Sequence, residues 1–141
     1  MSGFLLDTNI IAELIKPRPE PRVVAWVDAT DENLLYLSVL TLGEIRKGIV
    51  GLPHAARQAE LEAWLESDLR LRFAGRILTV DEAVAERWGI IAGNAAMRGA
   101  VMPVIDGLLA ATAIHNNLTL VTRNTGDVAE TGVLVFNPWE G

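Results

Sequence analysis

The sequence predicts an α/β fold, a three-layer sandwich in which helices cover both faces of a short, mainly parallel central sheet. Short apolar runs alternate along the chain with longer segments in which apolar residues recur every three or four positions, as in successive strand–helix units. The chain has 141 residues, of which 50% are apolar and 21% charged, and this composition suits a folded protein with one buried core. We therefore expect a single domain over residues 1–141.

Five apolar runs are short enough to be buried strands. They are residues 3–6, 34–38, 76–80, 118–122 and 133–136. Six further segments have the apolar spacing of a helix. They are residues 8–16, 22–29, 40–51, 55–71, 81–97 and 107–116. The last helix is almost wholly apolar, so we expect it to lie buried between the sheet and another layer.

The composition excludes several classes of protein. Without cysteine there is no disulfide scaffold, thiolate nucleophile or cysteine-bound zinc. No apolar run approaches the roughly 18 residues that span a bilayer, and the start lacks a signal-peptide pattern, so we expect no membrane association and a cytoplasmic location. A net charge of −6 is unusual for a nucleic-acid-binding protein. An acidic protein does, however, suit a basic protein partner.

Four carboxylates stand where an apolar run ends or a helix begins. Asp7 follows the first strand, Glu44 lies on the helix after the second, Asp106 follows the apolar run 101–105, and Asp127 follows the strand at 118–122. The carboxyl ends of the strands in an open α/β sheet line one crevice, so we expect these acids to meet there. Two carboxylates about 5 Å apart repel by roughly 3 kcal/mol at an effective dielectric constant near 20. Such a cluster must either take up protons or bind a cation.

Each acid also has a simpler explanation. Asp7 and Asp106 can be helix N-caps. Glu44 can be a solvent-exposed residue that pairs with Lys47 one turn on, and Asp127 can be an ordinary turn aspartate. Their shared placement favours a metal site over four independent coincidences. Two divalent cations bound there would bring the net charge from −6 to −2.

Oxygen ligands without histidine or cysteine favour Mg²⁺, with Mn²⁺ as the alternative, over zinc or copper. Magnesium binds phosphate oxygens well and activates water for attack on a phosphodiester, which predicts a nuclease. Four residues at the same edge of the sheet are candidate donors to the substrate phosphate. They are Thr8, Ser38, Thr122 and Arg123.

Three motifs carry a family resemblance. Residues 5–9 (LLDTN), 42–48 (LGEIRKG) and 106–113 (DGLLAATA) resemble the PIN-domain ribonucleases and, more closely, the VapC/FitB toxins of type II toxin–antitoxin systems. Residues 122–124 (TRN) and 135–139 (VFNPW) are similar to the FitB-like branch. The resemblance spans essentially the whole chain and implies a PIN-like fold.

By this resemblance Asp7, Glu44 and Asp106 would be the catalytic residues and core magnesium ligands. The family often has a fourth acid directly after the Thr-Arg pair, where this chain has Asn124. Either Asn124 or Asp127 would then complete the metal site, and the number of metal ions stays open. The resemblance also implies an RNA substrate, a homodimer and a cognate VapB/FitA-like antitoxin that inhibits the enzyme.

Two other functions compete with this interpretation. One is an aspartate-based phosphatase or phosphotransfer domain with Asp7 as nucleophile. The haloacid-dehalogenase pattern needs a second aspartate at the position of Asn9, and a receiver domain needs a lysine where Thr122 and Arg123 stand. The other is a PIN-like interaction module without nuclease activity, whose acids only bind a basic partner.

Overall fold

A computed structural model describes residues 2–141 and contains a five-stranded sheet in which every pair of neighbours is parallel. The strands are β1 (Phe4–Leu6), β2 (Leu35–Ser38), β3 (Ile77–Leu78), β4 (Thr119–Val121) and β5 (Val135–Phe136). Their order is β3-β2-β1-β4-β5. The chain therefore winds outward from β1 in both directions. In such sheets, ligands bind beyond the carboxyl ends of the strands where the winding reverses.

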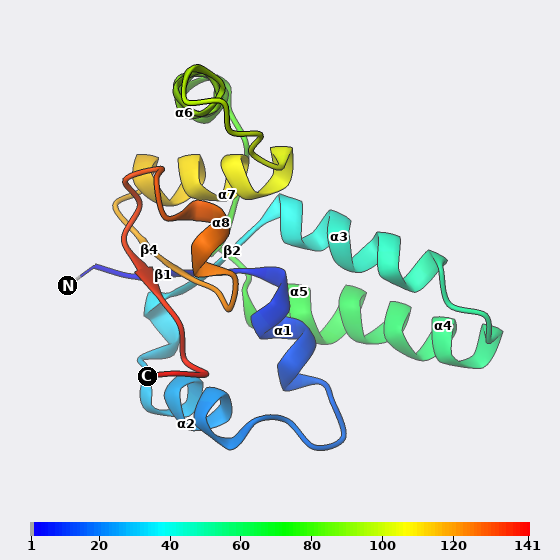
Figure 1. Cartoon of the computed structure of the whole chain (residues 1–141). Coiled ribbons are helices and arrows are strands. Elements are labelled where there is room, and N and C mark those ends of the chain that lie inside the picture. Colours follow the sequence, from blue (N-terminus) through cyan, green and yellow to red (C-terminus); the bar gives the residue numbers. More distant parts are fainter. Residues whose placement is uncertain (1) are drawn as a thin grey trace.

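Helices cover both faces of the sheet, as predicted (Figure 1). One face carries α7 (Val104–His115) and α8 (Thr125–Val128), and α6 (Glu82–Met97) packs on the outside of α7. The other face carries α1 (Thr8–Leu14) and α2 (Pro21–Ala29). Beyond the carboxyl end of the sheet, α3 (Val39–Val50) forms a hairpin with a long rod made of α4 (Ala55–Ala63), the π-helical segment η2 (Trp64–Leu69) and α5 (Arg70–Arg72).

The buried residues form a cluster on each face of the sheet because strand side chains alternate between faces. Leu6 and Val121 pack with Ile10 of α1 and Leu65 of the rod. Leu5 and Leu120, on the opposite face, pack against α7. A third, smaller cluster joins α6 to α7. The prediction that the helix at 107–116 is buried is thus confirmed.

The predicted boundaries differ from the structure at three places that bear on the site. Helix α7 begins at Val104, so Asp106 lies inside its first turn and does not cap it. The apolar run 101–105 is largely exposed, with Val101 at 95% and Val104 at 55%, and its last two residues belong to α7. Asp127 lies on the short helix α8, where the sequence predicted a loop. A 3₁₀ turn, η1 (Glu32–Leu34), also precedes β2.

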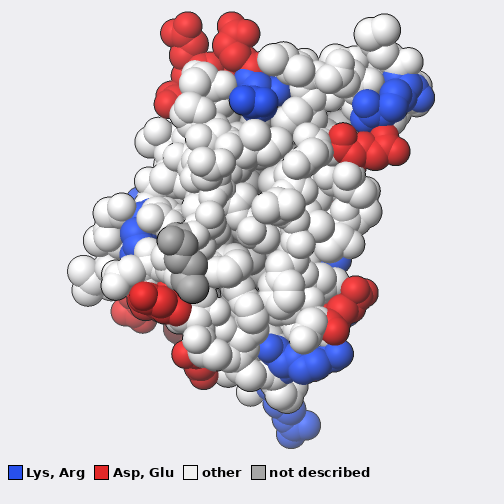
Figure 2. Space-filling model, turned by 90° about the vertical axis from the view of Figure 1, so that its left-hand side faces the viewer, with Lys and Arg blue, Asp and Glu red and all other residues white. Residues whose placement is uncertain are grey.

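The face with the amino ends of the strands is largely uncharged, and its charged side chains lie toward the periphery (Figure 2). Among the described residues, no helix combines the length and apolar character that crossing a membrane requires. The carboxyl edge of the sheet, on the other side of the molecule, is where the candidate acids lie.

Candidate functional site

The four candidate acids come from four elements that meet at the carboxyl edge of the sheet. Asp7 directly follows β1 and caps α1, and Glu44 lies in the second turn of α3. Asp106 lies in the first turn of α7, and Asp127 in the short helix α8 that follows β4. Helices α1 and α3 both start at this edge (Figure 1).

Asp7 is only 9% exposed, and both of its carboxylate oxygens accept hydrogen bonds. Oδ1 accepts from the backbone N–H of Thr8 at 2.7 Å, and Oδ2 from the Thr122 hydroxyl at 2.8 Å. Burial raises the pKa of Asp7 above its ordinary value, and the charges of Glu44 and Asp127 raise it further. The two hydrogen bonds oppose this rise because they stabilise the ionised form.

Glu44 is oriented by the hydroxyl of Thr8, which in turn lies beside the hydroxyl of Thr41. The Thr8 hydroxyl donates to Glu44 Oε1 at 2.6 Å and lies 3.2 Å from the hydroxyl of Thr41. Thr41 is fully buried and was not among the predicted site residues. Its position three residues before Glu44 on the same helix face is the sequence signal that could have identified it.

The pKa of Asp106 is also raised above its ordinary value. Burial is the main cause that raises its pKa, followed by the charges of Asp7, Asp127 and Glu44. The four carboxylates are therefore near enough to act on one another. Within residues 2–141, however, no three His, Asp or Glu side chains lie close enough together to enclose a metal ion as they stand. The donor set nevertheless fits a hard divalent cation, since it offers only oxygens and a positive charge would relieve the raised pKa values.

The four candidate phosphate donors differ in accessibility. Ser38 is fully buried and its hydroxyl accepts from the N–H of Leu40, which caps α3. Thr122 is 1% exposed and its hydroxyl donates to Asp7. Both hydroxyls thus serve the protein's own hydrogen bonds. Thr8 is half-buried and Arg123 is exposed, with its guanidinium 5.1 Å above the ring of Trp139.

Asn9 is a further polar neighbour of Asp7. Its amide nitrogen lies 3.5 Å from Asp7 Oδ2 and 3.3 Å from the Thr122 hydroxyl, and its amide oxygen accepts from the N–H of Arg123 at 3.4 Å. Asn124, the alternative candidate for the fourth ligand, precedes α8 and is exposed, and its backbone N–H donates to the Thr122 hydroxyl.

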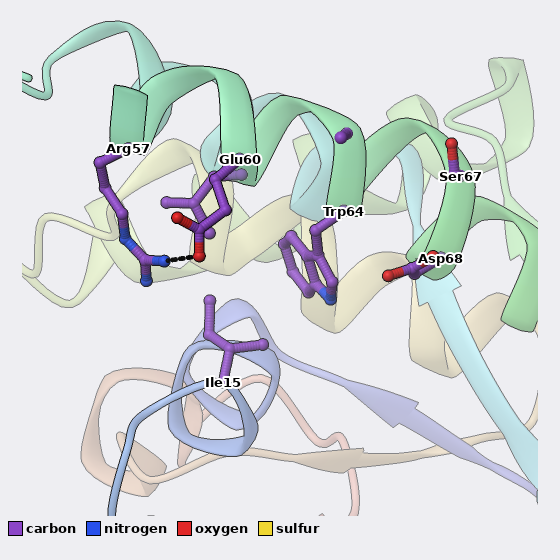
Figure 3. Close-up of a pocket in the computed structure, with 8 residues that line it drawn as sticks. Ile15, Arg57, Glu60, Trp64, Ser67 and Asp68 are labelled. Atoms are coloured by element: carbon purple, nitrogen blue, oxygen red, sulfur yellow. Dashed lines mark hydrogen bonds and ion pairs between the residues drawn. The ribbon is translucent and has the colours of Figure 1, made fainter. Parts of the chain in front are cut away.

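A separate apolar groove of about 420 Å³ lies between the end of α1 and the α4–η2 rod (Figure 3). Ile15 points across it toward Trp64, the Arg57–Glu60 ion pair flanks one end, and Asp68 lies toward the other. None of the four candidate acids lines it. A neighbouring cavity of about 280 Å³ shares three of its residues and continues along α1 to Ile11.

The fold and the site together define a class of protein: an α/β protein with an all-parallel sheet and acidic side chains at the carboxyl edge of that sheet. Comparison with known proteins identifies the family. The PIN domain profile matches residues 4–133, and the chain belongs to the PIN domain family.

Its relatives cover nearly the whole chain. The toxin FitB of Neisseria gonorrhoeae is 42% identical over 136 residues, which are 96% of this chain and 98% of FitB. The VapC ribonuclease Y4jK of Sinorhizobium fredii is 35% identical over 97% of this chain and 98% of its own. The crystal structure of FitAcB from Neisseria gonorrhoeae has a TM-score of 0.93 at 41% identity, and covers 98% of this chain and 99% of that chain. The resemblance to PIN-domain proteins of the VapC/FitB type, and the fold it implied, are confirmed.

Proposed function

We propose that this protein is a divalent-metal-dependent endoribonuclease, the toxin of a type II toxin–antitoxin system, which hydrolyses RNA phosphodiester bonds in the cytoplasm. The observation that carries the proposal is the placement of Asp7, Glu44, Asp106 and Asp127 on four elements that meet at one edge of the sheet, where Thr8 hydrogen-bonds to both Asp7 and Glu44. The VapC and FitB names of the relatives support the same activity.

In this proposal Asp7, Glu44 and Asp106 hold Mg²⁺ or Mn²⁺, and Asp127 completes the site, with Asn124 as the alternative. When bound, the ion supplies charge neutralisation at the phosphate and activation of water for attack on phosphorus. Thr8 and Thr122 orient Glu44 and Asp7 through their hydroxyls. Arg123 is exposed at the same edge and is our candidate contact to the substrate phosphate.

The surroundings of Asp7 argue against an aspartyl-phosphate mechanism. A nucleophilic carboxylate must be reached by the bulky substrate phosphorus, whereas a metal ion is small enough to reach a nearly buried carboxylate through its remaining lone pairs. Both oxygens of Asp7 already accept hydrogen bonds, and the residue is 9% exposed. A ligand role is compatible with this geometry because hydrogen-bonded carboxylates are common in metal sites.

We further propose that a cognate antitoxin inhibits the enzyme and that its segment occupies the apolar groove beside α1. The groove exposes apolar side chains of Ile15 and Trp64, and α1 leads from there to Asp7 at its other end. A segment that follows α1 from this groove therefore reaches the acids, where basic side chains are favoured. A homodimer is the proposed assembly, because α6 exposes the large apolar side chains of Ile90 and Met97.

The substitution Asp106→Asn tests the nuclease. We prefer it to Asp7→Asn because Asp7 also caps α1, so its loss would weaken the fold as well. We expect cleavage of RNA in Mg²⁺ to fall by about 100-fold or more, since even residues that only support a metal ligand are worth about 10–100-fold. Glu62→Gln, at an exposed position on α4, is the matched control and should cleave like the wild type. Undiminished cleavage by purified Asp106→Asn would overturn the proposal and favour an interaction module.

A further inference from the structure

A cavity of about 310 Å³ lies beside the acid cluster, at the carboxyl end of α6. The cavity is lined by Ala95 and Arg98 at the end of α6 and by the loop at residues 100–103. Residues 126–127 of α8 and residues 129–130 just after it complete the lining. The volume is close to the lower limit of about 300 Å³ for small-ligand sites. It is therefore suited to one small ring system and its attachments.

Asp127 links this cavity to the candidate site. It lines the cavity, and its charge raises the pKa values of both Asp7 and Asp106. Met102, which also lines the cavity, packs against the first turn of α7, where a Cβ placed on Gly107 would meet its sulfur at 3.2 Å. The wall is thus held against the turn that carries Asp106. A ligand in the cavity would therefore lie beside Asp127, one of the four candidate acids.

The chemistry of the walls favours a flat heterocycle. Ala95, Ala129, Met102 and Pro103 provide apolar surface, and thioether sulfur makes favourable contacts with aromatic rings. At the rim, Arg98 and Glu130 form an ion pair in which Arg98 Nε lies 2.8 Å from Glu130 Oε2. Their side chains are 44% and 69% exposed, so the ion pair contributes little stability and either partner can turn to a ligand at small cost.

We propose that this cavity binds the nucleobase next to the scissile phosphodiester and that Arg98 and Glu130 select guanine; the inference rests on the proposed ribonuclease function. Arginine donates to the O6 and N7 acceptors of guanine, and a carboxylate accepts from its N–H groups. Guanine presents both kinds of atom on adjoining edges. Recognition of single-stranded RNA commonly reads these edges of unstacked bases.

Nucleotide binding tests the cavity without any cleavage. ¹⁵N-labelled protein is titrated with GMP, AMP, CMP, UMP and inorganic phosphate, and the amides of residues 100–102 and 126–130 are followed by NMR. We expect shifts at these amides that are largest with GMP and that are lost in Arg98→Ala. Arg87→Ala is the matched control, since Arg87 is exposed on the same helix, about 16 Å along its axis from Arg98. Equal shifts with all four nucleotides, shifts with phosphate alone, or none at these amides would overturn the proposal.

Cleavage of a randomised RNA supplies the second readout. Sequencing of the fragment ends should show a guanine preference at one position next to the cut, which Arg98→Ala and Glu130→Gln reduce at least fivefold. A uniform loss of rate with the preference unchanged would identify Arg98 as a phosphate contact and refute base selection. The two proposals fail separately. GMP binding without RNA cleavage would refute the ribonuclease proposal and leave nucleobase binding in the cavity supported. Cleavage without base preference would refute the nucleobase proposal and leave the ribonuclease proposal supported.

Discussion

The hydroxyl of Thr122 connects three parts of the candidate site. It donates to Asp7 Oδ2 at 2.8 Å, accepts from the N–H of Asn124 at 3.0 Å and lies 3.3 Å from the amide of Asn9. A buried hydroxyl with this many partners fixes the carboxylate in one orientation. Thr122 also lowers the pKa of Asp7 against the opposing effect of burial. We therefore assign it to positioning Asp7.

The substitution Thr122→Val removes this hydroxyl and nearly preserves the side-chain shape. We expect RNA cleavage to fall by about 10–100-fold, as for other residues that support a metal ligand. The pKa of Asp7 should rise further, so the acidic limb of the pH–rate profile should move to higher pH. Thr122→Ser keeps the hydroxyl and should retain both rate and profile. A wild-type profile in Thr122→Val would show that the bond to Asp7 has no part in the reaction.

The positions of the acids could be predicted from the sequence because strand ends and helix starts are local features. The partners of their side chains could not. Thr122 and Asp7 are 115 residues apart, and no local sequence pattern shows that the Thr122 hydroxyl is buried against Asp7. Thr122 and Ser38 thus looked like surface donors to a phosphate, whereas the structure buries both. Only the packed fold decides whether a polar group at a sheet edge faces solvent or a neighbouring carboxylate.

The packing of α6 on α7 depends on a close approach at Gly107. A Cβ at this position would meet Cδ1 and Nε1 of the Trp88 indole at 2.9 and 3.1 Å, and Met102 at 3.2 Å. The indole Nε1–H is buried without a hydrogen-bond partner among the described residues. The indole therefore packs between α6 and α7, against Gly107, the residue that follows Asp106.

We expect Gly107→Ala to destabilise the fold despite the higher helix propensity of alanine. Alanine gains about 1 kcal/mol over glycine within a helix, but overpacking costs about 1–3 kcal/mol. The net loss should be about 1 kcal/mol in urea unfolding, with a changed near-UV circular dichroism signal from Trp88. Gly93→Ala is the control, because a Cβ there meets nothing within 4 Å, and it should stabilise the protein. Stabilisation by both substitutions would disprove the close contact.

The local sequence predicts the boundaries of some helices and not of others. Asp81 caps α6 and Ser38 caps α3, so both helices begin within a residue of the prediction. The start of α7 was placed three residues late because Pro103 has no side chain that can cap, and the exposed run before it resembles a buried strand. Within the helix predicted at 55–71, the π-helical segment Trp64–Leu69 has no distinctive amino-acid composition that would have predicted it. This stretch contributes Leu65 and Leu69 to the core, and such long-range packing is not visible in a local sequence pattern.

The charge of the whole molecule makes its stability sensitive to divalent cations. Folding brings four carboxylates together in a protein that already has a net charge of −6. Folding raises the pKa values of Asp7 and Asp106, so the folded state binds more protons than the unfolded state. By linkage, these two groups reduce stability at neutral pH, and the reduction fades as the pH falls through their raised pKa values. A bound cation should likewise remove this loss of stability, because its charge offsets the repulsion between the carboxylates without protonating them.

Mg²⁺ should therefore raise the melting temperature of the wild type at pH 7.5 more than that of Asp106→Asn. A ligand at ten times its dissociation constant stabilises the folded state by about 1.4 kcal/mol, or about 5 °C for a chain of this size. Without Mg²⁺ the variant should be at least as stable as the wild type, because it lacks one of the repelling charges. Differential scanning fluorimetry with Mg²⁺, and with Na⁺ at equal ionic strength, separates specific binding from screening. An equal Mg²⁺ shift in both proteins would show that Asp106 is no ligand, and the acidic edge would then be better explained as a docking surface for a basic partner.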